Sequence, residues 1–364
     1  MKIFKIDSAL VLSIAFILGF ASCTLGKGGA SKESNAGLYQ FHSSVTILAP
    51  GTDGTGGKGG TYCYFGDWPQ TLKSDDVIVD ETKSISVGSQ TYYLGSDNNY
   101  YARCTENAYF ANCTYSNGEP VLKSSSSSQR YFRVEPIKWR MLNPGEDGNK
   151  ILVAENILTA DIPYYDYYNE NRTIDGKTVY PNNYGHSKIR AYLNGLSYVV
   201  KNSDTEEQKT DGTYLNRGFL QTAFTESAQN LIALTDVDNS AESTNPDGDA
   251  KLWKEGQNVN ACSDTRDKIF LLSEREATAA DYGFAEYKDS GKHNSRIRKA
   301  TDYAKANYAY QDSSAEFGGW WWLRSPLYYG SDIARVVSHD GNARHYSHWF
   351  YRNVGIVPAL TMVL

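Results

Sequence analysis

The hydrophobic and polar positions of the chain follow two different periods. Between residues 131 and 142 apolar and charged side chains alternate, with Ile137, Trp139 and Met141 set against Lys138 and Arg140. A period of two is typical of a half-buried β-strand, so we expect a strand pair or one bent strand here. Further strands are expected at 77–79, 92–94, 151–154, 268–272, 320–324, 332–337, 343–350 and 354–364.

The middle of the chain follows a helical period instead. In 187–200 apolar residues recur three and four positions apart, and Ser187 stands where a helix N-cap is needed. A capping box, Ser273 with Glu276, predicts another helix start. Further helices are expected at 214–224, 226–233, 273–280 and 301–310. Strands at both ends with helices between them predict an α+β fold.

The N-terminus has the pattern of an export signal. Lys2 and Lys5 precede an apolar run at 9–20, and Ala21-Ser22-Cys23 follows directly. The apolar run is shorter than the ~20 residues of a membrane span. We therefore predict a lipoprotein signal peptide at 1–22, with lipid on Cys23; its loose cleavage box resembles those of spirochaete lipoproteins. The alternative is ordinary cleavage, which leaves Cys23 free or in a disulfide.

A flexible tether is expected at 23–60, because this segment is rich in Gly, Ser, Lys and Thr. The domain proper is then 61–364, with a polar, Tyr-rich insertion at about 96–128 that ends in a five-serine run. No acidic residue follows Cys23 to indicate retention at the inner membrane. The expected location is the cell envelope, lipid-anchored at the outer membrane surface.

Composition narrows the class of partner. The net charge of −6 argues against nucleic acid, which needs a basic surface. Tyr is abundant, at 28 residues, beside 7 Trp and 13 Phe. Such aromatics suit a binding surface, because Tyr offers a large contact area at low entropic cost. Strand-rich proteins also carry many aromatics, so this observation alone decides little.

Four cysteines remain if Cys23 takes lipid. An even number in an exported chain predicts disulfides. Cys104 with Cys113 would close a small loop, and Cys63 with Cys262 would then follow. The chain has no C-x-x-C spacing, which disfavours zinc and thioredoxin-like chemistry.

Six short motifs occur in order along the domain. They are 65–70 (FGDWPQ), 136–140 (PIKWR), 189–194 (IRAYLN), 267–273 (DKIFLLS), 321–326 (WWLRSP) and 355–360 (GIVPAL). They resemble a bacterial domain family of unknown function whose members end in WWLRSP and then GVRPAL. The resemblance covers 62–364. It departs from the family pattern at Val357, where the family has Arg, and in the insertion at 96–128.

The C-terminal layout is also similar to C-type-lectin-like proteins. These include treponemal variable proteins of diversity-generating retroelements and formylglycine-generating-enzyme-like folds. The resemblance implies a C-type-lectin-like domain in which N- and C-terminal strands pair and two helices pack beside a twisted sheet. Formylglycine-generating relatives hold copper with two nearby cysteines late in the chain, but Cys262 is the only late cysteine here.

The resemblance implies a ligand surface in 327–353, a stretch crowded with aromatic and adaptable polar side chains. Its residue types are also those that a diversity-generating retroelement produces. A polar loop with scattered aromatics is the plainer reading. The candidate ligand-binding residues are Tyr328, Tyr329, Ser331, Asp332, His339, Asn342, Arg344, His345, Tyr346, His348, Trp349 and Tyr351.

Metal and catalytic patterns are weak by comparison. His345 and His348 lie three apart on an expected strand, so their side chains point to opposite faces, and we predict no metal site. A calcium-binding acidic loop remains an alternative, formed from Asp236, Asp238, Asn239, Asp247 and Asp249. Expected cofactors are otherwise none.

The sequence contains no G-x-S-x-G, H-E-x-x-H or phosphate-cradling loop. We therefore expect a non-enzymatic surface lipoprotein that binds a protein or glycan ligand, as an adhesin or a diversified receptor. The alternatives are a glycan-acting enzyme, whose two carboxylates can come from anywhere in the chain, and a structural envelope lipoprotein.

Overall fold

The computed structural model describes most of the chain after residue 60, together with one short segment before it. Residues 1–37 and 38–364 are separate units, and every described element belongs to the second unit. The predicted signal peptide, Cys23 and most of the tether lie outside the described residues. The described residues are 44–48, 61–109, 113–122, 128–142, 148–166, 171–202, 204–244, 260–286, 293–327, 330–343, 345–348 and 350–363.

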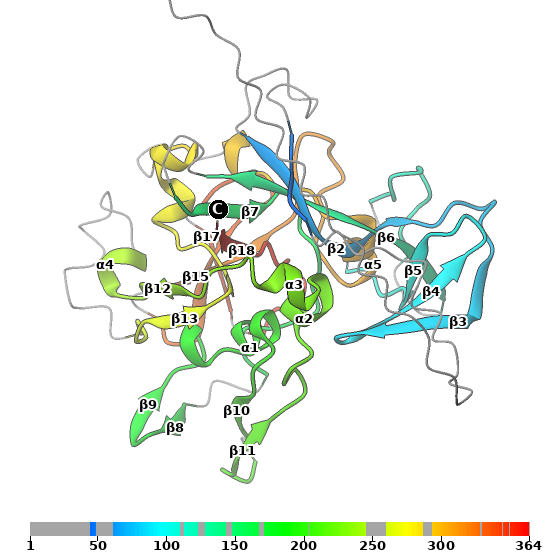
Figure 1. Ribbon diagram of the computed structural model, residues 1–364. Coiled ribbons are helices and arrows are strands. Elements are labelled where there is room, and N and C mark those ends of the chain that lie inside the picture. The colour runs from blue at the N-terminus through cyan, green and yellow to red at the C-terminus, as the bar shows by residue number, and fades with distance from the viewer. Residues whose placement is uncertain are drawn as a thin grey trace, which may run out of the picture. The chain divides into compact units, whose positions relative to one another are not determined.

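The largest sheet is antiparallel and has nine strands (Figure 1). Their order is β14 (Ile269–Phe270), β18 (Ala359–Met362), β7 (Lys150–Ala154), β6 (Gln129–Met141), β5 (Tyr100–Thr105), β4 (Gln90–Gly95) and β3 (Val79–Val87), with β2 (Tyr62–Leu72) on β6 and β1 (Thr46–Ile47) on β2. β1 falls inside the expected tether, so the prediction of a flexible coil up to residue 60 is wrong at these two positions.

The long strand β6 joins the two halves of this sheet. β2 pairs along most of one edge of β6, whereas the other edge pairs with β5 near its start and with β7 near its end. The alternation expected from the sequence holds for Ile137, Lys138 and Trp139, since Ile137 and Trp139 are fully buried and Lys138 is half-buried, but it ends at Arg140, which is also buried. The indole N–H of Trp139 donates to the carbonyl of Phe65 across the sheet (2.7 Å).

Smaller sheets surround this frame. β8 (Arg172–Ile174) pairs with β9 (Lys177–Val179), β10 (Tyr198–Lys201) with β11 (Gln208–Asp211), and β12 (Thr235–Val237) with β13 (Thr265–Asp267). A three-stranded sheet contains β15 (Trp321–Pro326), β16 (Ile333–Val337) and β17 (His345–His348), in that order. This sheet holds the C-terminal region singled out by the sequence.

The helices are short and several begin at the expected caps. They are α1 (Lys188–Asn194), α2 (Phe219–Ala223), α3 (Glu226–Gln229), α4 (Ala241–Thr244) and α5 (Asp302–Ala306), with 3₁₀ turns at Tyr184–His186, Glu276–Thr278, Ala280–Tyr282 and Asn294–Arg296. Ser187 caps α1 by accepting from the Arg190 N–H. The capping box also forms reciprocally between Ser273 and Glu276 (3.1 and 2.8 Å), but it opens 3₁₀ turns rather than the expected α-helix.

The predicted helix at 187–200 is half as long as expected. Gly195 adopts a left-handed conformation (φ +69°) and ends α1, which is the usual role of glycine at a helix C-terminus. The following residues form β10 and pair with β11. Tyr198 and Val200 are still buried there, because a strand also directs alternate side chains to one face.

Two further expectations are wrong. The segment 96–128 is not a single loop insertion, because it contributes β5 to the main sheet between β4 and β6. The N- and C-terminal strands do not pair either. β2 and β18 share a sheet, but β6 and β7 separate them. The coarser expectation of a strand-rich α+β fold is confirmed.

Cys63, Cys104, Cys113 and Cys262 form no disulfides in the structure, so neither predicted pairing is present. Cys63 is fully buried in the main core on β2, and burial raises its pKa to about 12. Burial likewise raises the pKa of Cys104 to about 12 and that of Cys262 to about 11. These thiols pack as apolar side chains do. The spacing of cysteines along the sequence cannot distinguish such thiols from cysteines that form disulfides.

Candidate functional site

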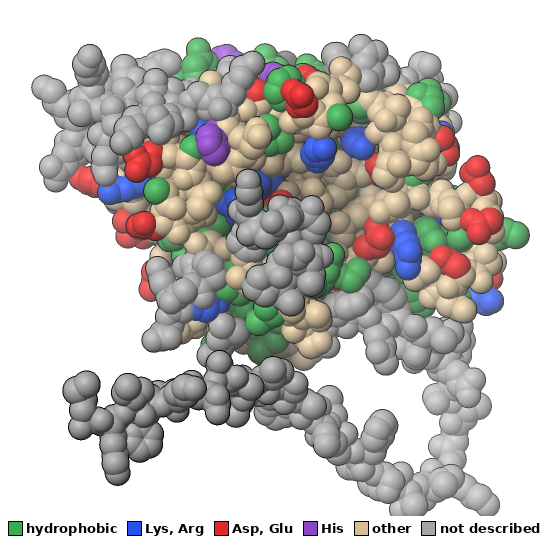
Figure 2. Space-filling view, turned by 90° about the horizontal axis from the view of Figure 1, so that it is seen from above, with side chains coloured by type: hydrophobic (Ala, Val, Ile, Leu, Met, Phe, Trp, Pro, Cys, Tyr) green, Lys and Arg blue, Asp and Glu red, His purple; other side chains and the backbone are tan. Residues whose placement is uncertain are grey.

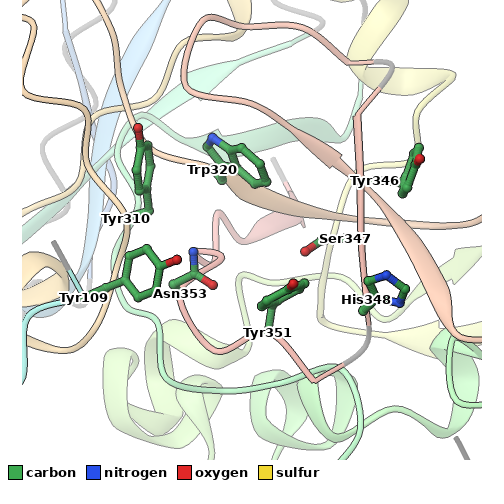
Figure 3. Close-up of a pocket in the computed structure, with 8 residues that line it drawn as sticks. All are labelled: Tyr109, Tyr310, Trp320, Tyr346, Ser347, His348, Tyr351 and Asn353. Atoms are coloured by element: carbon green, nitrogen blue, oxygen red, sulfur yellow. The ribbon is translucent and has the colours of Figure 1, made fainter.

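A groove of about 590 Å³ lies against the C-terminal sheet (Figure 3). Three separate parts of the chain build it: Tyr109 after β5, the segment between α5 and β15, and β17 with the residues that follow. Six of the eight lining residues have aromatic rings. The lining consists of Tyr109, Tyr310, Trp320, Tyr346, Ser347, His348, Tyr351 and Asn353.

One wall is a row of rings in mutual contact. The ring centroids of Tyr109 and Tyr310 lie 6.3 Å apart, and those of Tyr310 and Trp320 lie 5.9 Å apart. The chain can bring Trp320 beside Tyr310 because residue 319 is glycine: a Cβ there would lie 2.3 Å from the Tyr310 carbonyl oxygen. Tilted aromatic pairs of this kind stabilise each other beyond simple burial, so the wall is held in place before any ligand arrives.

Two polar side chains fix this wall from behind. The indole N–H of Trp320 donates to Nδ1 of His339 (3.1 Å). The hydroxyl of Tyr310 donates to the carboxylate of Asp312 (3.1 Å). Burial, and then the hydrogen bond and charge of Asp312, raise the pKa of Tyr310 to about 12. His339, a predicted ligand residue, therefore supports the wall instead of lining the groove.

The opposite wall comes from β17 and the turn after it. Tyr346 is 46% exposed and Tyr351 is 41% exposed, which leaves much of both rings open to solvent. The His348 ring stacks on Phe350 (5.6 Å between centroids), and its Nδ1 lies 3.1 Å from a carboxylate oxygen of Asp332. Asp332 thus orients a lining residue from outside the groove.

Two hydrogen-bonding side chains lie between the walls. Ser347 is 3% exposed and Asn353 is 8% exposed, and Figure 3 shows both directed into the space between the rings. Neither side chain has a hydrogen-bond partner among the described residues, and the polar atoms of neither are among the fully enclosed ones, so water or a ligand can reach them. They are therefore the groups in the groove best placed to bind an incoming molecule.

The backbone near Tyr109 is strained. Tyr308 has φ of +71°, a conformation that bulky residues rarely adopt. Its ring meets that of Tyr109 edge to face at 5.3 Å. Strain of this kind often persists next to functional sites, and here it accompanies the placement of a groove ring.

The structure brings together only part of the predicted ligand surface. Tyr346, His348 and Tyr351 line the groove. Asn342 instead belongs to a tight turn, in which its N–H approaches Asp340 (3.3 Å) and its carbonyl accepts from Ser338 (3.0 Å). The carbonyl of Ser331 accepts from the Asn182 N–H (3.2 Å). Tyr328, Tyr329, Arg344, Trp349 and the side chain of His345 lie outside what the structure describes.

Sequence reasoning missed five lining residues. Tyr109 falls in the presumed insertion, and nothing in its neighbours indicates a role. For Tyr310 and Trp320 the sequence predicts only a helix and a strand. Ser347 and Asn353 lie within the expected region but were passed over for their larger neighbours. The only available signal was the third tryptophan, Trp320, directly before the WWLRSP motif.

The WWLRSP motif forms the scaffold beneath the site. Trp321 and Trp322 are both fully buried, and the Trp321 indole N–H donates to the Arg296 carbonyl (3.1 Å). Arg324 is 2% exposed and makes a two-pronged ion pair with Glu276. Its guanidinium also donates to the Leu271 carbonyl (2.9 Å). Arg324 therefore holds the fold together.

A second pocket, of about 660 Å³, is lined in part by this arginine. Its charged side chains are Asp236, Asp238, Glu242, Arg275, Glu276, Asp281 and Arg324. Burial tends to raise the pKa of Asp238, but hydrogen bonds from Ser240 and Ser243 and the charge of Arg324 hold it below its usual value. Asp236 forms an exposed ion pair with Arg266 (3.0 Å).

The described residues that were expected to bind calcium therefore make hydrogen bonds and ion pairs within the protein instead. The amide of Asn239 donates to the Ser263 carbonyl and the Thr265 hydroxyl (3.2 Å each). Asp247 and Asp249 lie outside the described residues. Across the described ranges, no group of three or more His, Cys, Asp or Glu side chains is placed to hold a metal ion.

Two broader surface features bear on partners. On the face seen in Figure 2, basic and acidic side chains are interspersed. None of the helices in the described part of the chain has the length and apolar character needed to cross a bilayer.

Comparison with known proteins gives one match. A family model, a domain of unknown function (DUF6273), matches residues 147–363. No curated protein and no solved structure matches the chain. The match begins after β6, later than the resemblance at 62–364 suggested, so Tyr109 lies outside it and seven of the eight groove residues lie within it. The chain belongs to the DUF6273 family.

Proposed function

We propose that this protein binds an extracellular ligand in the aromatic groove and does not transform it. The observation that carries the proposal is the pair Ser347 and Asn353, which are largely buried but have no hydrogen-bond partner among the described residues, beneath exposed aromatic rings. A binding pocket typically combines apolar and aromatic walls with a few well-placed polar groups. The ring contacts along the wall suit a preformed site, which lowers the entropic cost of binding.

The two alternatives raised by the sequence fit the groove less well. A glycan-acting enzyme needs two carboxylates flanking the bond to be cleaved, and none of the eight described lining residues is Asp or Glu. A purely structural envelope protein would have no need of a hollowed aromatic surface. Exposed aromatic rings that cluster in one groove instead mark an interaction site.

The wider setting of the site is also part of the proposal. A lipid on Cys23 and a tether would hold the domain at the outer membrane surface, where the groove meets extracellular molecules. A C-type-lectin-like ancestry fits a ligand surface built from C-terminal strands. If a diversity-generating retroelement varies this region, the tolerant positions would be Tyr346, His348 and Tyr351, because His339 and Asn342 hold the scaffold.

The test is a binding screen of the purified chain against arrayed glycans and a phage-displayed peptide library. We expect at least one class of probe to bind the wild type. The double variant Tyr346→Ala/Tyr351→Ala should lose that binding while keeping its unfolding midpoint, because both rings are exposed. Tyr93→Ala, which removes a half-buried ring on β4 outside the groove, is the matched control.

Two outcomes would refute the proposal. One is that no probe of either class binds the wild-type chain. The other is that probes bind equally well to the double variant, which would place the binding surface elsewhere on the molecule.

A further inference from the structure

The groove lining carries no full charge among the described residues. None of its eight members is Lys, Arg, Asp or Glu. Three carboxylates beside the groove are engaged, since Asp312 accepts from Tyr310, Asp332 contacts His348 and Asp161 pairs with Arg352. An ionic ligand entering this groove would lose its hydration without gaining an opposite charge, which is costly. The lining therefore favours an uncharged ligand.

The same lining disfavours a purely apolar ligand. Such a molecule would displace water from Asn353 and Ser347 and leave both without hydrogen bonds, at a cost for each group. The amide of Asn353 both donates and accepts, and so does the hydroxyl of Ser347. Their best partner is a ligand whose own groups also do both, which is the property of a hydroxyl.

The aromatic walls of the groove further narrow the class of ligand. The face of an aromatic ring is negative and its edge positive, so a ring face attracts C–H bonds polarised by neighbouring oxygens. A sugar ring has C–H groups on its faces and hydroxyls on its rim. We therefore propose that the groove binds an uncharged carbohydrate, an inference that rests on the proposed ligand-binding function.

The extent of the groove indicates more than one sugar unit. Ring platforms stand on both sides of the groove, with Tyr351 across from Tyr109, Tyr310 and Trp320 (Figure 3), and the Tyr346 ring extends the lining on the far side of β17. The volume of about 590 Å³ lies well within the range of small-molecule pockets. A neutral oligosaccharide can stack successive rings on these platforms while its hydroxyls reach Asn353 and Ser347. Its affinity should accordingly exceed that of the corresponding monosaccharide.

The test is to compare neutral oligosaccharides with sialylated or sulfated ones on an array and to titrate the hits by calorimetry. Neutral oligosaccharides should bind, and their affinity should hardly change between low and high salt, because no charges are paired. Asn353→Ala should weaken binding about tenfold, the equivalent of one lost hydrogen bond. Asn117→Ala, in an exposed turn outside the groove lining, should leave binding unchanged.

The outcomes separate this inference from the proposed function. Peptides that bind in a manner dependent on Tyr346 and Tyr351, with no neutral glycan bound, would overturn the carbohydrate inference and leave ligand binding standing. Exclusive binding of anionic glycans would do the same. If neither glycans nor peptides bind, both proposals fail together. If neutral glycans bind the wild type and Asn353→Ala equally well, the assigned contacts are wrong.

Discussion

The aromatic groove and the acidic pocket are hollows of similar size on the same domain, about 590 and 660 Å³, with opposite chemistry. The groove is lined by uncharged side chains, and its two buried polar groups have no partner in the described protein. The acidic pocket is rich in charge, yet Glu276 is paired with Arg324 and Asp236 with Arg266.

The difference shows that the density of charge in a pocket is a poor guide to binding. A charge already paired within the protein contributes to the fold, because separating the pair costs more than an external ligand readily returns. More informative is a polar side chain that opens into a groove and has no partner among the described residues, as for Ser347 and Asn353, because water or a ligand can reach it. The unpartnered atoms of the acidic pocket, Thr235 Oγ1 and Arg324 Nε, are instead fully enclosed. On this criterion we propose the groove, and not the acidic pocket, as the binding site.

The largest expected effect is on stability, at the wall of the acidic pocket. Arg324→Met should lower the free energy of unfolding by about 3 kcal/mol or more, because it breaks a buried ion pair by removing one partner. Urea unfolding measures this change. Ligand binding in the groove should persist in the folded fraction. Loss of binding without destabilisation would instead make the acidic pocket the functional one.

A matched variant in the same pocket sharpens this result. Asp236→Asn removes one partner of an ion pair whose side chains are 81% and 68% exposed. Exposed pairs contribute little to stability, so its unfolding midpoint should match that of the wild type. A large change would mean that the pocket holds more structure together than its exposed edge indicates.

The second effect falls on binding. Tyr109→Ala should weaken ligand binding by about 1–2 kcal/mol, typical of a lost aromatic anchor, although Tyr109 lies outside the DUF6273 match. Calorimetry with a ligand found in the screen measures this, and Tyr93→Ala serves again as the control. Unchanged affinity would mean that the family domain forms the groove without help from the N-terminal strands.

The sequence predicted local features well and the assembled site poorly. Ser187 and the box Ser273–Glu276 were located correctly, because a cap depends on residues within one turn. Gly195 was overlooked as a helix stop, since apolar spacing continued past it. The strand expected at 320–324 would alternate its side chains between two faces, but Trp321 and Trp322 are both fully buried, so the alternation does not predict exposure here.

The candidate site was found only where it is continuous in sequence. Tyr346, His348 and Tyr351 lie in one aromatic-rich stretch, so the local composition was enough to single them out. Tyr109 and Tyr310 join them through long-range packing, which no local pattern records. The expected disulfides failed for a related reason: spacing cannot show that Cys63 is enclosed in the core on β2.

The third prediction compares two substitutions of the strained Tyr308. Tyr308→Gly and Tyr308→Ala both remove the ring that meets Tyr109, but only glycine adopts a positive φ without penalty. The Gly variant should therefore be about 1 kcal/mol more stable than the Ala variant in urea unfolding. Both should bind ligand more weakly than the wild type if this ring positions Tyr109. Equal stability of the two variants would show that the backbone relaxes on loss of the ring.

The smallest effects concern pH, and the two regions should respond with opposite sign. Asp161 lies behind the groove, where its N–H donates to the Arg352 carbonyl between Tyr351 and Asn353 (2.8 Å). Burial raises the pKa of Asp161 despite the ion pair with Arg352, whereas the pKa of Asp238 in the acidic pocket is lowered by hydrogen bonds that outweigh its burial.

A raised native pKa means that ionisation of Asp161 costs stability as pH rises above about 4. A lowered one means that ionised Asp238 adds stability above that pH and loses it as pH falls. Relative to the wild type, Asp161→Asn should therefore gain stability between about pH 4 and 7, and Asp238→Asn should lose it. Asn also tolerates the positive φ of residue 161 (+65°). Urea unfolding across this range measures both slopes. Slopes of the same sign would show that Asp161, behind the groove, is stabilised by its partners as effectively as Asp238 in the acidic pocket. The groove and the acidic pocket would then not differ in how well their carboxylates are paired.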